Sequence, residues 1–339
     1  MAHGGGGRET WGLVRSLIVS KVPEWLRRFG GGYGTDVLDD GAAFRVGGVW
    51  VVIASDSFTV NPPVFPGGDI GHLAACGVIN DVVMMGADPA LALDDVVVEE
   101  GVEEEFVGRL LESFISVLVS EGVALVGGDF KVMPRGSVDK IVISATCVGL
   151  TADDPIVDRV REGDKVVVTG PIGEHGAAIL AAQLGMGDGM EGIKSDSKPL
   201  TRCVLPTIKR FRKYIHAARD PTRGGLAATL SEWVEGTDKA VVIRRADIPV
   251  RREVREFLDA VGVDPLDMAC EGVAAIAVEP DVADDLVKCL KSCGEHRAAV
   301  VGEVIKAPDP VLAGRVIGVT EVGGKVVIEP KPISLPRIC

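Results

Sequence analysis

Asp153-Asp154-Pro155 interrupts the chain near its middle and separates two halves that each carry their own strand and helix patterns. Short apolar runs between turn signals predict strands, and apolar residues at helical spacing predict helices. The predicted strands occur in pairs as well as in alternation with helices. This arrangement favours an α+β fold of two domains over one doubly wound sheet. We expect an N-terminal domain at 1–154, a C-terminal domain at 155–325 and a flexible tail at 326–339.

The clearest predicted elements lie in the first half. Residues 49–54 have the length of a buried strand, and Asp69 is a good N-cap for a helix that reaches Met85. Residues 103–120 have helical spacing and an acidic first turn, which suits the helix dipole. The other predicted strands are 44–46, 91–98, 123–126, 140–148, 165–169, 241–244, 274–278, 298–304 and 325–328, and the other predicted helices are 10–19, 175–184, 200–213, 225–234, 251–261 and 281–293.

The tail ends in Pro336-Arg337-Ile338-Cys339 and carries three prolines after residue 328. Proline fixes φ and removes an N–H donor, so the stretch is typical of an extended arm. At about 3.3 Å per residue, fourteen residues reach on the order of 45 Å. A thiol at the tip of such an arm can visit a site on its own protein and a site on a partner. A frayed terminus with an idle cysteine is the alternative.

Size and charge limit the possible functions. The 339 residues suffice for two domains with full cores, and the net charge of −13 argues against nucleic acid as the main partner. An acidic protein that binds a nucleotide needs a cation between them. No apolar run approaches the roughly 18 residues of a membrane span. Seven cysteines, an odd number, fit a reducing compartment better than a disulfide framework, so we expect a cytoplasmic protein.

A group of aspartates suggests a metal site. They stand at the ends of apolar segments or, in one case, within an apolar helix: Asp40, Asp56, Asp81 and Asp129. Strand ends commonly meet on one side of a sheet, and a buried carboxylate is costly unless it is paired or binds a metal. Several carboxylates together suit Mg²⁺ held between protein and nucleotide phosphates. Taken singly, each aspartate is more typical of a cap or a turn.

Glycine-rich turns are the candidate phosphate sites. The turn 170–176 contains Gly173 and His175, and the turn 220–225 contains Asp220 and Arg223. Such turns can present backbone N–H groups to phosphate, or can be purely structural. The glycines at 127–128, before Asp129 and Lys131, allow close backbone approach to a ligand. His3 and its following glycines are a candidate nucleotide cover or a free terminus, and Cys289 and Cys293 are more typical of packing thiols than of a metal site.

These motifs together resemble the HypE family of hydrogenase maturation proteins. The resemblance covers nearly the whole chain and ends on the specific Pro-Arg-Ile-Cys terminus. Gly5 and Phe130 differ from the serine and threonine that are frequent in the family. Several internal motifs are shared with the wider superfamily of aminoimidazole ribonucleotide synthetase and selenophosphate synthetase. The motifs that carry the resemblance lie at 3–7, 39–43, 55–58, 68–71, 80–81, 127–131, 173–176, 220–225, 270–272 and 336–339.

The resemblance implies a function and a fold. The family receives a carbamoyl group on its C-terminal cysteine from the carbamoyltransferase HypF, dehydrates it to a thiocyanate with ATP, and passes the cyano group to iron on a HypC–HypD complex. The PurM-like superfamily fold pairs two α+β domains and forms a homodimer through N-terminal strands that share a β-barrel. It implies ATP and Mg²⁺ as cofactors.

The family pattern also assigns roles to residues of this chain. It makes Cys339 the covalent carrier and Lys131 and Glu271 the candidate proton-transfer or charge-stabilising groups, without deciding which of the two is the base. Glu271 has a salt-bridge role as its alternative. The residues assigned to ATP are Asp40, Asp56, Asn80, Asp81, Asp129, Gly173, His175, Asp220 and Arg223. Four of these are also assigned to Mg²⁺: Asp40, Asp56, Asp81 and Asp129.

Two rival functions stay open on the sequence. A selenophosphate synthetase is expected to carry a reactive cysteine or selenocysteine near its N-terminus, whereas the first cysteine here is Cys76. A non-catalytic thiol carrier would present Cys339 to iron-handling partners, but the acidic group argues for nucleotide turnover.

Overall fold

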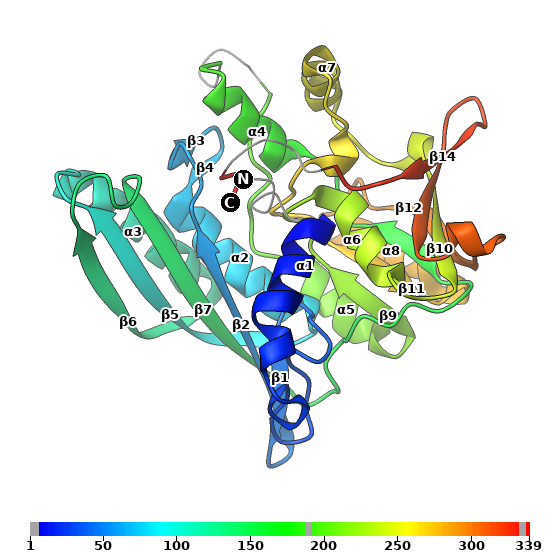
Figure 1. The fold of residues 1–339 in the computed structure, drawn as a ribbon, viewed down its shortest axis with the longest axis horizontal. Helices are drawn as coiled ribbons and strands as arrows, with labels where there is room; N and C mark the ends of the chain where they lie inside the picture. Colours follow the sequence, from blue (N-terminus) through cyan, green and yellow to red (C-terminus); the bar gives the residue numbers. More distant parts are fainter. Residues whose placement is uncertain (1–6, 187–191, 332–336) are drawn as a thin grey trace.

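The computed structural model describes residues 7–186, 192–331 and 337–339, with side chains from residue 12 onward. The segment around His3 lies outside these ranges. Each half of the chain builds its own sheet (Figure 1). No helix within the described residues is both long and apolar enough to cross a membrane. Short 3-10 helices lie at η2 (Val19–Lys21), η3 (Glu24–Leu26), η4 (Arg212–Tyr214), η5 (Arg245–Asp247), η6 (Pro265–Asp267), η7 (Pro280–Val282) and η8 (Pro310–Leu312).

The first sheet has five strands in the order β1-β2-β7-β5-β6. Its strand pairs are antiparallel except for β5 with β6, which are parallel. Helix α2 packs against β2 and β7, and α3 packs against α2 and β6. The elements are α1 (Gly7–Leu17), β1 (Ala42–Val46), β2 (Val49–Phe58), β3 (Val64–Phe65), β4 (Gly68–Asp69), α2 (Ile70–Met84), β5 (Asp88–Glu99), α3 (Glu104–Glu121), β6 (Ala124–Met133) and β7 (Ile141–Thr151).

Helix α2 forms where the sequence predicts it. The Asp69 side chain accepts hydrogen bonds from the backbone N–H groups of Gly71 and His72, at 2.8 and 2.9 Å, which confirms it as the N-cap. Nearly every residue of α2 is buried, because the helix lies between the first sheet and elements of the second half. A helix that is apolar all round is expected in such a position.

The second sheet has seven strands in the order β14-β13-β10-β12-β8-β11-β9. Helix α6 packs on β10 and β13, whereas α8 packs on β8 and β12 and belongs to a separate apolar cluster, so the two helices cover opposite faces. The elements are β8 (Lys165–Val168), α4 (Glu174–Gln183), α5 (Val204–Phe211), β9 (Ile215–Arg219), α6 (Gly225–Val234), β10 (Lys239–Arg244), α7 (Arg252–Val261), β11 (Ala275–Val278), α8 (Ala283–Cys293), β12 (Ala299–Lys306), β13 (Arg315–Val319) and β14 (Lys325–Ile328).

One apolar core joins the two halves. Residues of α2 share a buried cluster with Val204 and Ile208 of α5 and Leu286 of α8. This continuous contact fixes the position of the first sheet against the second. Polar residues at the boundary between the sheets are thereby held in a defined arrangement.

Three parts of the structure differ from the sequence-based expectation. The strand predicted at 123–126 runs on to Met133 as β6, because it continues its pairing with β5 through the glycines. Strands β9 and β13 and the ribbon β3–β4 were not predicted. Residues 326–328 belong to β14 rather than to the tail, because they pair with β13. The described part of the arm therefore begins after Ile328.

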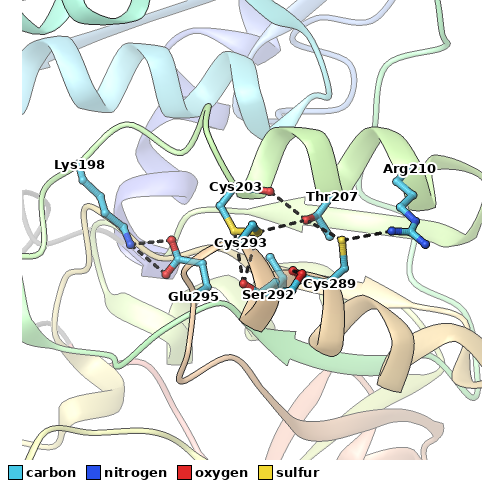
Figure 2. Close-up of a disulfide and its surroundings, with 9 residues drawn as sticks. Lys198, Cys203, Thr207, Arg210, Cys289, Ser292, Cys293 and Glu295 are labelled. Atoms are coloured by element: carbon cyan, nitrogen blue, oxygen red, sulfur yellow. Dashed lines mark hydrogen bonds and ion pairs between the residues drawn. A yellow bond between two sulfur atoms is a disulfide. The ribbon is translucent and has the colours of Figure 1, made fainter.

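The cysteines also differ from expectation. Cys203, at the N-cap of α5, forms a disulfide with Cys293 at the end of α8, with 5.4 Å between their Cα atoms (Figure 2). The expectation that Cys293 is a packing thiol is therefore wrong, because tertiary packing brings the two helix ends together. Cys289 stays free and half-buried, with its Sγ 3.5 Å from Thr207 Oγ1 (Figure 2).

Candidate functional site

Carboxylates from separate parts of the chain converge between the two sheets. Burial raises the pKa of Asp40, Asp81 and Glu271 well above the ordinary range, and neighbouring carboxylates raise each pKa further. Asp220 acts on all three of these groups. The converging residues come from the segment before β1, from β2, from α2, from the turn after β9 and from the turn before β11: Asp39, Asp40, Asp56, Asp81, Asp220 and Glu271.

Arg219, the last residue of β9, neutralises one side of this acidic cluster. Its Nε lies 3.1 Å from Asp40 Oδ1 and 3.1 Å from Asp158 Oδ2, and its Nη2 lies 3.3 Å from Asp39 Oδ1. Nη1 lies 2.5 Å from Glu232. A buried guanidinium is compatible with the fold only when carboxylates surround it in this way. Arg219, Asp39 and Asp158 did not emerge from the sequence, although Asp39 and Arg219 stand directly beside residues that did.

Several buried carboxyl oxygens of the cluster have no hydrogen-bond partner among the described residues. They are Asp40 Oδ2, Asp220 Oδ2 and Glu271 Oε1. Burial raises the pKa of Asp220 to about 7. Unpartnered buried oxygens of this kind suit a cation. Among the described residues, no three His, Cys, Asp or Glu side chains form a group that could hold a metal ion by themselves.

The Cys339 thiol lies close enough to the cluster to interact with its charges. Burial raises the pKa of this thiol, while the charge of Arg223 lowers it and Glu271 and Asp56 raise it. Arg223 Nη2 lies 3.5 Å from Asp56 Oδ1, and its side chain is 46% exposed. A cation, a thiol and an unpartnered carboxyl group therefore share one small region. Sequence-predicted residues from both halves of the chain meet here.

The end of the tail is docked rather than free. The main-chain oxygen of Cys339 accepts hydrogen bonds from Thr59 N at 3.0 Å and from Thr59 Oγ1 at 3.1 Å. Asn61 N donates to Arg337 O at 3.1 Å, and the Ile338 oxygen lies 2.9 Å from His175 Nε2. Figure 1 shows the C-terminus between the halves, near α4 and the β3–β4 ribbon. Thr59 and Asn61 were not predicted as functional residues.

Glu271 is held by its backbone. Its N–H donates to Asp196 Oδ1 at 3.2 Å, and the N–H of Gly272 donates to Asp196 Oδ2 at 3.1 Å. A Cβ at position 272 would lie 1.9 Å from the Asp196 carbonyl oxygen, so only glycine fits there. These contacts fix the main chain and leave the Glu271 carboxyl group free to act. Asp196 gave no signal in the sequence.

Asn80 has a structural role that differs from the predicted one. Its Nδ2 donates to Lys198 O at 3.0 Å and to Glu271 O at 3.2 Å, and its Oδ1 accepts from Leu200 N at 2.8 Å. Both N–H groups and the oxygen are thus in use. The side chain ties α2 to the segment that follows residue 194, and a contact of Asn80 with phosphates stays a prediction.

Gly173 and His175 also face the protein. Gly173 begins α4 with a φ of +81°, and its N–H donates to Cys270 Sγ at 3.1 Å. His175 is fully buried, and both ring nitrogens have partners, Ser195 Oγ on one side and the tail on the other. His175 therefore contacts the tail in this conformation, and an ATP contact by either residue stays a prediction.

Asp129 and Lys131 lie away from the cluster. Both are exposed on the edge strand β6, and Lys131 Nζ lies 2.5 Å from Asp129 Oδ2. The strand register aligns Asp56 with Gly128 across three strand spacings, about 14 Å, and side chains alternate between the two faces. Asp129 therefore lies on the opposite face from Asp56. Within one chain, Asp129 and Lys131 thus lie apart from the acidic cluster, and their roles in metal binding and catalysis stay predictions.

Comparison with known proteins identifies the family. Residues 38–151 match the N-terminal domain, and residues 161–315 the C-terminal domain, of AIR synthase related proteins. The chain is 36% identical over 346 residues to the carbamoyl dehydratase HypE of Cupriavidus necator, covering 100% of this chain and 94% of the relative. Sequence and structure therefore agree on the predicted fold class, two α+β domains of the PurM-like type.

Two solved structures give the same result. The hydrogenase maturation protein HypE in complex with ATP superposes with a TM-score of 0.82 at 33% identity, covering 99% of this chain and 98% of the other. A HypE–HypF complex superposes with a TM-score of 0.83 at 30% identity, covering 96% and 100%. The chain belongs to the HypE family of carbamoyl dehydratases.

Proposed function

We propose that the protein uses ATP to dehydrate a carbamoyl group carried on Cys339 to a thiocyanate, which supplies the cyanide ligand of a [NiFe]-hydrogenase. The observation that carries this proposal is the position of the Cys339 thiol beside Arg223 and Glu271, with the main chain of the tail hydrogen-bonded to the protein. The name carbamoyl dehydratase for a 36% identical relative and the ATP bound in a solved HypE structure support it.

The proposed dehydration takes place in two steps. The amide oxygen of the thiocarbamate attacks the γ-phosphorus of ATP, which forms a C–O–P link and releases ADP. Removal of both nitrogen protons and cleavage of the C–O bond then give the C≡N triple bond and inorganic phosphate. Phosphorylation is needed because an amide oxygen is otherwise a very poor leaving group. Water must be kept from the activated intermediate, which suits a reaction between two packed halves of the chain.

Two groups beside the thiol have the right chemistry for these reaction steps. Glu271 has an unpartnered oxygen and a raised pKa, so its ionised form is a strong proton acceptor for the nitrogen protons. Arg223 carries a fixed positive charge that stabilises negative charge developing on the carbamoyl oxygen. Lys131 contributes only in an assembly in which a second subunit presents its β6 to this site.

Mg²⁺ is part of the proposal. The unpartnered oxygens of Asp40 and Asp220, together with Asp56 and Asp81, are the residues that would hold it with the phosphates of ATP. The ion supplies charge neutralisation between the acidic protein and the nucleotide. An acidic cluster that Arg219 only partly neutralises supports this assignment.

The partners follow from the same function. HypF, which is present with HypE in a solved complex, supplies the carbamoyl group, and a HypC–HypD complex receives the cyano group. This exchange requires the tail to leave the docked position. We place the protein in the cytoplasm, and the free Cys289 and Cys339 fit a reducing compartment even though Cys203 and Cys293 are bonded.

A homodimer is also proposed. The face of the first sheet opposite α2 carries half-exposed apolar side chains, including Val51, Ile53 and Val148, together with Leu93 at 38% and Leu150 at 43% exposure. An apolar sheet face of this kind favours association with a second copy. A shared barrel between two such faces would bury it.

The rival function is a thiol carrier without catalysis. The test compares ATP turnover of the protein with a carbamoylated and with an unmodified tail. The proposal predicts turnover that rises with carbamoylation and stops after one equivalent of thiocyanate has formed. Turnover that is absent, or that is identical with both tails, would favour the carrier.

A further inference from the structure

The last three residues run antiparallel to residues 59–61 and are joined to them by two backbone hydrogen bonds. Thr59 bonds the oxygen of Cys339, and Asn61 bonds the oxygen of Arg337. From the first hydrogen bond to the second, the donor moves two residues forward, from 59 to 61, and the acceptor moves two residues back, from 339 to 337. This is the pattern of antiparallel pairing. We propose that Thr59, Asn61, Asp139 and His175 form a tail dock, a set of positioning residues that holds Cys339 in register with Glu271. The inference rests on the proposed function and adds residues to it.

Asp139 supplies the charged part of the tail dock. Its carboxylate forms an ion pair with the Arg337 guanidinium, whose Nε also donates to Thr59 O at 2.6 Å. Asn61 Nδ2 donates to the same Asp139 oxygen at 3.3 Å. Arg337 has a φ of +62°, a left-handed conformation that non-glycine residues adopt only under strain. The ion pair therefore holds a conformation that relaxes when the tail leaves.

His175 supplies the neutral part of the tail dock. The Ile338 carbonyl oxygen can only accept, so His175 Nε2 carries the proton and Nδ1 accepts from the Ser195 hydroxyl at 2.8 Å. Ser195 Oγ in turn accepts from Ser197 N at 3.1 Å. Burial lowers the pKa of His175 to about 4, which keeps the ring neutral at physiological pH.

The tail dock and Glu271 share one segment of chain. Ser195 contacts His175, and the next residue, Asp196, holds the backbone of Glu271. Lys198 then contacts Asn80, which also holds the Glu271 carbonyl. Because these contacts come from three residues of the short segment 195–198, a docked tail and a correctly placed Glu271 favour each other. The thiol and its proton acceptor are therefore positioned by the same hydrogen-bond chain.

The tail dock recognises the arm rather than its cargo. Its contacts within the described residues go to the main-chain oxygens of 337–339 and to the Arg337 guanidinium. A carbamoyl group, a cyano group or a free thiol on Cys339 leaves all of these contacts available. The same tail dock therefore serves the tail before and after dehydration.

The test uses full-length protein and the rate at which iodoacetamide alkylates Cys339, normalised to that of Cys289 by peptide mass spectrometry. Asp139→Asn, with a side chain that is 49% exposed, leaves the fold intact. We expect Cys339 of this variant to react about threefold to tenfold faster than in the wild type. Arg337→Gln should accelerate the reaction by the same factor. The double variant should react no faster than either single variant. Asp238→Asn, which removes another exposed ion pair, is the matched control and reacts as the wild type.

A second measurement separates positioning from simple stability. Asp139→Asn and His175→Gln should dehydrate a preloaded carbamoyl group more slowly by the same factor, while accepting the group from HypF at the wild-type rate or faster. Wild-type alkylation and dehydration rates in both variants would overturn the tail dock. If the wild type itself forms no thiocyanate, the proposed function fails, and the alkylation rates still decide whether the tail dock exists.

Discussion

Glu271 is buried, its main chain is fixed by Asp196, and one carboxyl oxygen has no partner among the described residues. Glu271→Gln keeps the shape and removes the proton acceptor. We expect single-turnover dehydration to fall at least about 100-fold, with ATP binding within about threefold of the wild type. Glu321→Gln, at an exposed site, is the control. Dehydration at the normal rate would assign the proton transfer to another group.

Asp220 makes the apo protein sensitive to pH. Burial raises its pKa to about 7, so in the window between about pH 4 and 7 the folded chain binds more protons than the unfolded one. The contribution of this group to the free energy of unfolding therefore falls as pH rises, by on the order of 1 kcal/mol per pH unit. Denaturant titrations at several pH values check this, and Asp220→Asn should remove part of the slope.

The same residue predicts proton release. A cation near Asp220 favours its carboxylate, so binding of Mg²⁺–ATP near pH 7 should release protons, as calorimetry in two buffers of different ionisation enthalpy measures. Binding without proton release, or release unchanged in Asp220→Asn, would contradict a cation at this cluster.

The sequence identified candidate acidic residues more readily than the way in which their side chains point. Asp40, Asp56 and Asp81 converge as expected, because the segment before β1, strand β2 and helix α2 meet at the boundary between the sheets. Asp129 does not join them, because the strand continues past the glycines and strand alternation puts its side chain on the other face. Asp139 and Thr59 could not be found from the sequence, since they contact tail residues that lie 198 and 280 positions further along the chain.

Helices α5 and α8 are linked by the Cys203–Cys293 disulfide across 90 residues. A loop of this length predicts about 4–5 kcal/mol of stabilisation through the lost freedom of the unfolded chain. Replacing both cysteines by serine should lower the free energy of unfolding by about 2–5 kcal/mol in denaturant titrations without reductant. Cys289→Ser should change it by less than about 1 kcal/mol. Equal effects of the two changes would argue that the disulfide does not form.

The elements that could be predicted are those with a clear period. The apolar and acidic spacing of α3 and the N-cap of α2 gave both helices nearly to the residue. Strand β9 shows no alternation because all five of its residues are buried, so its sequence does not separate it from the preceding helix. The disulfide was missed because Cys203 and Cys293 meet only through tertiary packing.

At the scale of the whole molecule, the outer face of the first sheet carries half-exposed apolar side chains that a second copy could cover. Leu93→Asp combined with Leu150→Asp places two charges on this face and should convert a dimer into a monomer, as light scattering after size-exclusion chromatography reports. Val322→Asp, at another exposed apolar residue, is the control. A wild-type protein that is monomeric at micromolar concentration would contradict the shared barrel.

The two halves, the acidic cluster and the docked tail together support Cys339 as the residue that carries the group to be dehydrated. The direct measurement is mass spectrometry of the C-terminal peptide after incubation with HypF, carbamoyl phosphate and ATP. We expect a carbamoyl adduct on Cys339 that loses one water only when ATP is hydrolysed. An adduct that never loses water with hydrolysable ATP, or that forms equally on a Cys339→Ala protein, would contradict it.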